Sequence, residues 1–100
     1  NEIKRKDLFD KGLRNITQSD WIRVAGKLNI SVLKSQSGTS HYISLRDPDV
    51  VETDSLKGFI TTILPNLYKQ ANRSIFKSIL RHIKSKGLSE DDLWKALGLL

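Results

Sequence analysis

The sequence predicts an α+β fold in which a three-stranded antiparallel sheet carries helices on one face, with an N-terminal arm and a C-terminal helix added. Three observations predict it: one segment with a helical apolar period, three short β-type segments separated by turns, and two more helical segments at the end. A chain of 100 residues, 38% of them apolar, has material for one core but not two. We therefore expect a single domain over residues 1–100.

The segment before the first predicted helix, residues 1–16, is rich in charge. Ile3, Leu8, Phe9 and Leu13 are candidates for helical contacts. We expect an N-terminal arm or a short helix there. The chain begins at Asn1 and contains no methionine, so we also expect that residues upstream have been removed.

The first well-marked helix starts after Thr17. Thr17 and Asp20 have the spacing of a capping box, and Ile16 and Trp21 have the spacing of a hydrophobic staple. Its apolar positions recur with the helical period at Trp21, Val24, Ala25 and Leu28.

Three β-type segments follow this helix. They run from Ile30 to Gln36, from His41 to Arg46 and from Gly58 to Leu64. The turn-rich residues 37–40 join the first two as a hairpin, and the acidic residues 47–57 are predicted to form an exposed loop. Pro65 closes the third strand because it has no amide to donate to a ladder.

Two helices complete the chain. Asn72 is predicted to cap the first of them, and Gly87 stands where a left-handed residue ends it. Ser89 and Asp92 repeat the capping-box spacing before a final helix that carries Leu93, Trp94 and Leu97. The acids at 90–92 therefore indicate a helix start rather than a metal site, because consecutive helical positions point about 100° apart.

The net charge of +6 belongs to one segment. Residues 66–88 contain six basic side chains and no acid. Four of them fall on one stripe of an ideal helix, opposite its apolar side: Arg73, Lys77, Arg81 and Lys84. Like charges at this spacing repel one another, which a polyanion would relieve. The stripe therefore favours nucleic-acid binding, with a merely solvated helix face as the alternative.

Two side chains, His41 and His82, titrate near neutral pH. His82 lies at the border of the apolar side of the basic helix and reads as a partly buried spacer. His41 follows a turn of small and hydroxyl residues and opens the second strand, so it is the better candidate for chemistry. Trp21 and Trp94 occupy apolar helical positions and are expected in the core, whereas Tyr42 stays open as a base-stacking residue.

Three features together resemble the HicA toxins of bacterial toxin–antitoxin pairs. They are the Gly38-Thr39-Ser40-His41 turn, the third strand closed by Pro65, and the segment 74–80 (SIFKSIL). The likeness covers about residues 20–97. HicA proteins have a fold like that of double-stranded RNA-binding domains, cleave mRNA without the ribosome through the histidine of that turn, and are silenced by a HicB antitoxin.

The resemblance implies a cytoplasmic, metal-independent endoribonuclease (an mRNA interferase) with no cofactor. It implies that His41 is the general base on the 2′-hydroxyl of the RNA, and that a HicB-like antitoxin is the protein partner. It divides the chain into an arm (1–16), a HicA-like core (17–88) and a C-terminal helix (89–100). The RNA-binding candidates are Lys34, Gly38, Thr39, Ser40, Arg46, Arg73, Lys77, Arg81 and Lys84.

Two other functions stay open. Asn66 and Leu67 follow Pro65 where many family members have a second histidine, so a non-catalytic RNA-binding module is one alternative. A basic protein-interaction domain is the other. The absence of cysteine excludes disulfides and thiolate metal sites, and no apolar run reaches the ~20 residues of a membrane span.

Overall fold

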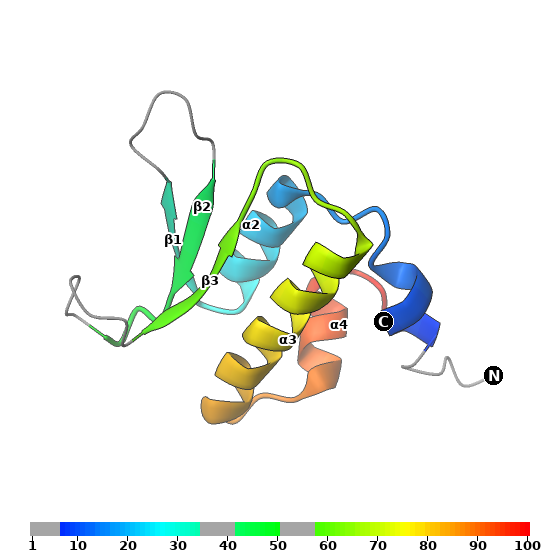
Figure 1. Ribbon diagram of the computed structural model, residues 1–100. Coiled ribbons are helices and arrows are strands. Elements are labelled where there is room, and N and C mark those ends of the chain that lie inside the picture. The colour runs from blue at the N-terminus through cyan, green and yellow to red at the C-terminus, as the bar shows by residue number, and fades with distance from the viewer. Residues whose placement is uncertain (1–6, 35–41, 51–57) are drawn as a thin grey trace.

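The structure is a computed structural model that describes residues 7–34, 42–50 and 58–100 (Figure 1). Its elements are η1 (Leu8–Gly12), α2 (Gln18–Lys27), β1 (Ser31–Lys34), β2 (Ile43–Arg46), β3 (Phe59–Ile63), α3 (Lys69–Ser85) and α4 (Glu90–Ala96). This confirms the predicted α+β fold and the predicted order of helices and strands. Each described strand lies inside the range that the sequence predicts for it.

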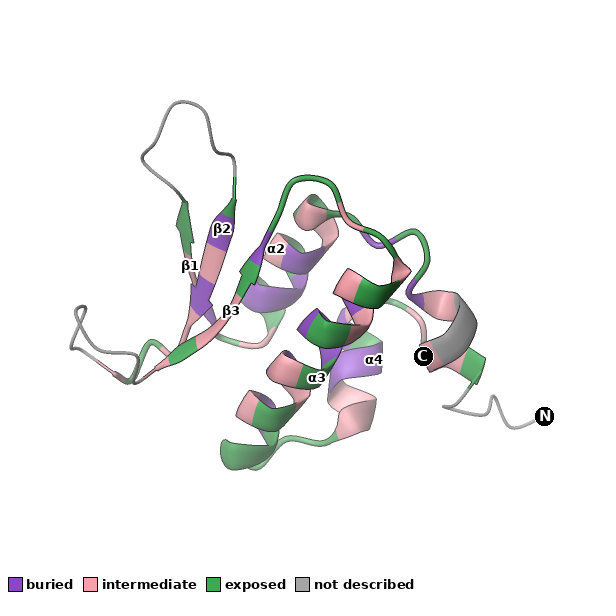
Figure 2. Cartoon of the chain, viewed as in Figure 1, coloured by how far each residue is buried: buried purple, intermediate pink, exposed green. Residues whose placement is uncertain are grey.

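The three strands form one antiparallel sheet in the order β1-β2-β3. Helix α3 packs against β3, α2 packs against β1, and α4 contacts both helices (Figure 1). Strand β2 alternates as a strand of a half-buried sheet should: Ile43 and Leu45 are buried towards the helices, and its other residues are half-buried. Ile63 of β3 is buried with them, whereas Leu33 of β1 is 50% exposed. Figure 2 shows the buried residues along β2, α2 and α3 where these elements meet.

The pairing of β2 with β3 contains one irregularity. Leu45 lies opposite Thr61, and Arg46 lies opposite Phe59, so Ile60 is an extra residue on β3. Such a bulge changes the direction in which the following side chains point. Counted in steps of two from buried Ile63, Phe59 would face the core. The extra residue reverses this, so half-buried Ile60 packs against the core and Phe59 is exposed.

The local helix signals are confirmed at three ends. Thr17 forms the predicted capping box with Asp20, and Ser89 forms the second one with Asp92. Gly87 is left-handed (φ 85°) and ends α3 as predicted, with the Leu88 amide donating to the Ile83 carbonyl at 2.9 Å.

The predicted cap of α3 is wrong. The helix begins at Lys69 with Tyr68 as its N-cap, and Asn72 lies within it, completely buried. The Asn72 side chain is used elsewhere: its carbonyl oxygen accepts from Trp21 Nε1 at 2.9 Å. Its amide donates to the carbonyls of Leu13 and Ile16 at 2.7 and 3.1 Å. Asn72 therefore joins α3 to α2 and to the N-terminal segment instead of capping a helix.

The core lies between the sheet and the helices and includes both tryptophans. Trp21 and Trp94 are 0% exposed, which confirms their predicted place in the interior and leaves neither available for base stacking. Phe76 packs against Trp94 with 4.4 Å between ring centroids and meets the edge of Phe9 at 5.6 Å. Leu13 is also fully buried, so the N-terminal segment contributes to the same core.

Candidate functional site

The proposed catalytic turn lies outside the described residues. This applies to Gly38, Thr39, Ser40 and His41, so the role of His41 stays a prediction. The two candidates on the strands are described: Lys34 is exposed at the end of β1, and Arg46 is half-buried at the end of β2.

The predicted basic stripe lies on the outer side of α3, opposite its buried residues. Lys77, Arg81 and Lys84 are exposed, and none of the three has an ion pair within residues 7–34, 42–50 and 58–100. Arg73 differs because it is half-buried, and its guanidinium lies 5.2 Å from the centroid of the Phe9 ring. Lys77 Nζ lies 5.6 Å from the same ring. The stripe is therefore anchored at its N-terminal end by η1 and open to solvent further along.

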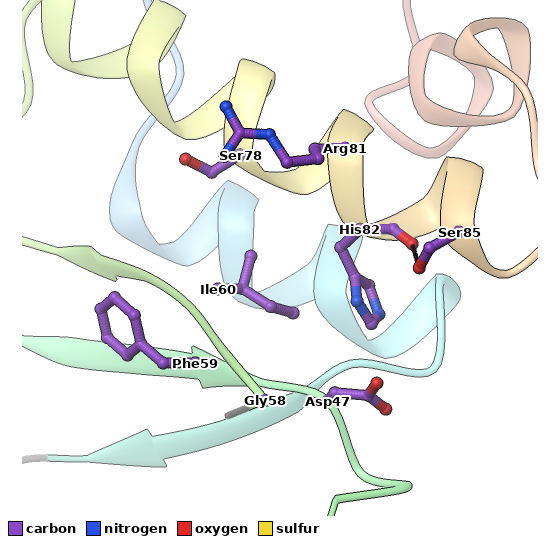
Figure 3. A pocket seen from close by; sticks show the side chains of 8 residues that line it. All are labelled: Asp47, Gly58, Phe59, Ile60, Ser78, Arg81, His82 and Ser85. Carbon is purple, nitrogen blue, oxygen red and sulfur yellow. Dashed lines mark hydrogen bonds between the residues drawn. The ribbon is translucent and has the colours of Figure 1, made fainter. Parts of the chain in front are cut away.

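A cavity of about 280 Å³ lies beside the stripe, between α3 and the start of β3. Figure 3 shows that residues from both elements line it. The lining residues are Asp47, Gly58, Phe59, Ile60, Ser78, Arg81, His82 and Ser85. Arg81 belongs to both features, so the exposed cations lead directly to the cavity.

The wall of the cavity beneath β3 depends on Gly58. Its φ of 83° is in the left-handed region, and a Cβ placed there would lie 2.8 Å from Val50 Cβ. The Gly58 carbonyl accepts from the Asp47 amide at 2.7 Å. Only glycine allows this close approach without displacement of the chain. The hydrogen bond from Asp47 to Gly58 then holds the residue after β2 beside the residue before β3.

Asp47, one of the residues that line the cavity, belongs to a charged cluster. Lys86 Nζ lies 3.0 Å from Asp47 Oδ2 and 2.8 Å from Asp49 Oδ2. The Asp49 amide donates to Asp47 Oδ1 at 2.9 Å. This amide and Lys86 lower the pKa of Asp47, and hydrogen bonds to Asp49 and Asp47 raise the pKa of Lys86. The predicted exposed loop is thus tied to the end of α3 in its described part, residues 47–50, and Asp47 is half-buried.

His82 is half-buried, as its sequence position predicts, and its imidazole points from α3 towards Asp47 (Figure 3). Burial lowers the pKa of His82, and the charge of Lys86 lowers it further, whereas Asp47 and Asp49 oppose the shift. Its backbone carbonyl accepts a hydrogen bond from the Ser85 hydroxyl. A neutral imidazole near pH 7 can both donate and accept hydrogen bonds.

This cavity is not among the sites predicted from the sequence. The sequence pattern that could have indicated the cavity is a polar series along one edge of α3: Ser78, His82 and Ser85 stand at i, i+4 and i+7. The partner wall could not be predicted, because the bulge at Ile60 depends on the pairing of β2 with β3.

Within the described ranges no three histidine, aspartate or glutamate side chains are grouped as metal ligands would be. No described helix has both the length and the apolar character needed to cross a bilayer. In comparisons with known proteins, the chain matches no family model, no curated protein and no solved structure.

Proposed function

We propose that this protein binds RNA through the exposed side of α3 and cleaves it with His41. The observation that carries the binding part is the set of three exposed cations, Lys77, Arg81 and Lys84, without an ion pair in the described structure. Because no carboxylate pairs with them within the described residues, these three cations keep a positive potential that attracts a polyanion. Their spacing extends over about 10 Å of helix, enough for more than one phosphate.

The cleavage part rests on the resemblance to HicA toxins and on the chemistry of imidazole. Neutral His41 would take the proton from a ribose 2′-hydroxyl, and the 2′-oxygen would attack the adjacent phosphorus. The P–O5′ bond then breaks, water or a lysine protonates the leaving oxygen, and a 2′,3′-cyclic phosphate remains. A general base of this kind contributes ~10²–10⁴ in rate. Lys34, Arg46 or the stripe would stabilise the charge on the phosphorane.

The test of cleavage uses purified protein and end-labelled RNA in EDTA. We expect 2′,3′-cyclic phosphate ends from RNA and no cleavage of DNA, which has no 2′-hydroxyl. The His41→Ala protein is the control, and equal cleavage by it would refute the role of His41. RNA that is bound but stays intact would favour the non-catalytic module.

The test of binding compares two double variants with the same change in charge. Lys77→Gln/Lys84→Gln removes two cations from the stripe, and Arg14→Gln/Lys95→Gln removes two exposed cations elsewhere. For about four phosphate contacts the log–log salt slope is near −3, and each lost contact changes it by roughly 0.7. We expect a slope near −1.5 for the stripe variant and no change for the control. Equal slopes for both variants would show that α3 is not the RNA-binding surface.

By the same resemblance, a HicB-like antitoxin is the proposed inhibitor. An acidic surface on it would compete with RNA for Lys77, Arg81 and Lys84. If the protein retains no RNA at low salt but binds an acidic protein, the alternative of a protein-interaction domain applies instead.

A further inference from the structure

We propose that the cavity between α3 and β3 holds one unpaired nucleotide of the bound RNA, with the base stacked on Phe59 and a phosphate held at Arg81. This inference rests on the proposed function for the identity of its ligand. Its evidence comes from the described residues around the cavity and is independent of His41.

The cavity has the size and the aromatic surface for a single base. Its volume is about 280 Å³, close to the lower end of the range for small-molecule sites. Phe59 is among the lining residues and is 43% exposed, so the residue has surface available to a ligand. Ile60, turned towards the core by the bulge, adds apolar surface beside it. Stacking on such a ring is how proteins hold bases of single-stranded nucleic acid.

The polar groups of the cavity suit a phosphate. The exposed Arg81 guanidinium provides several donors in one plane, and Ser78 lines the same cavity (Figure 3). Asp47 is the carboxylate among the lining residues, and both of its oxygens are engaged, one by Lys86 and one by the Asp49 amide. Its repulsion of an anion is therefore offset by a bound ammonium group.

The cavity lies next to the surface along which the sugar–phosphate backbone of the bound RNA would run. Arg81 lies one helical turn from Lys77 and from Lys84, so phosphates bound along the stripe bring the next nucleotide to the cavity. In a duplex the bases are paired and stacked and cannot reach Phe59. The site should therefore distinguish single-stranded RNA from duplex RNA.

The test measures binding of a fluorescent 2′-O-methyl oligonucleotide, single-stranded or as a duplex, by anisotropy. The 2′-O-methyl group removes the nucleophile, so the unmodified protein can be used without cleavage. Phe59→Leu keeps apolar cover but removes the ring, and Tyr68→Leu is the matched control because Tyr68 is 65% exposed and lies outside the cavity. We expect Phe59→Leu to weaken single-strand binding by about 10-fold, within the range for one stacked base, and to leave duplex binding within about twofold. Tyr68→Leu should change neither.

Photo-crosslinking gives a second measurement that does not depend on affinity. A single strand that contains 5-bromouridine should crosslink to the tryptic peptide 58–69 in the unmodified protein and in Tyr68→Leu, but not in Phe59→Leu. Crosslinks confined to other peptides, or equal single-strand affinities for both variants, would overturn the inference while RNA binding itself stands. If the unmodified protein binds neither strand form at low salt, the proposed function fails and this inference fails with it.

Discussion

Removal of the Asn72 side chain is the sharpest test of how the structure holds α3 in place. Asn72→Ala deletes one acceptor and one amide group in a completely buried position. Three groups then lose their partner: the Trp21 indole N–H and the carbonyls of Leu13 and Ile16. The substitution also removes the link between α3, which carries the stripe and one wall of the cavity, and the elements behind it.

The expected cost follows from these three groups. A buried polar group without a partner costs about 1–3 kcal/mol, which gives roughly 3–9 kcal/mol for all of them. Alanine is the better helix former by about 0.6 kcal/mol, and water entering the vacated space restores some of the hydrogen bonds. We expect a net loss of about 3–5 kcal/mol, a large part of the ~5–15 kcal/mol that a domain of this size has.

The assay is equilibrium urea unfolding, followed by tryptophan fluorescence and circular dichroism. Asn66→Ala is the matched control, because Asn66 is exposed in the turn before α3. In thermal unfolding, 3–5 kcal/mol corresponds to a Tm roughly 15–30 °C lower. If Asn72→Ala costs less than about 1 kcal/mol, or no more than Asn66→Ala, the hydrogen bonds of Asn72 do not hold these elements together and the reasoning is refuted.

Three further predictions concern single residues. Gly58→Ala should destabilise the fold by about 1–3 kcal/mol, because Gly58 has a positive φ and a Cβ there would meet Val50. Gly26→Ala should stabilise the fold by about 0.5–1 kcal/mol, because Gly26 lies inside α2 with open space around it. Urea unfolding that ranks the two variants in the opposite order would contradict the structure. Because the pKa of His82 is lower in the folded chain, the unfolded chain binds this proton more tightly. The free energy of unfolding, measured by urea unfolding, should therefore decrease as the pH falls from about 6.5 towards the lower folded pKa. The His82→Gln protein should lose this part of the pH dependence. Thr17→Ala should cost about 1 kcal/mol in urea unfolding through loss of the capping box, and a value near zero would show that the cap contributes nothing.

Much of the candidate site followed from helical periodicity. The exposed cations Lys77, Arg81 and Lys84 and the buried side of α3 lie where the period places them. Arg73 shares that period but is half-buried beneath Phe9, a residue far away in the chain. The helical period predicts on which side of a helix a residue lies. It does not predict which other segment of the chain packs against that side.

Signals that depend on a few neighbouring residues determined the elements of this protein: the two capping boxes, the left-handed Gly87 and the alternation of β2. Their physics is local, because each requires only backbone groups within about one turn or one strand pair. The tertiary structure alone decided the long-range polar contacts, namely the use of Asn72 by Trp21 and the pairing of Lys86 with Asp47. A polar side chain can meet many partners, and only the packing of the whole chain selects one of them.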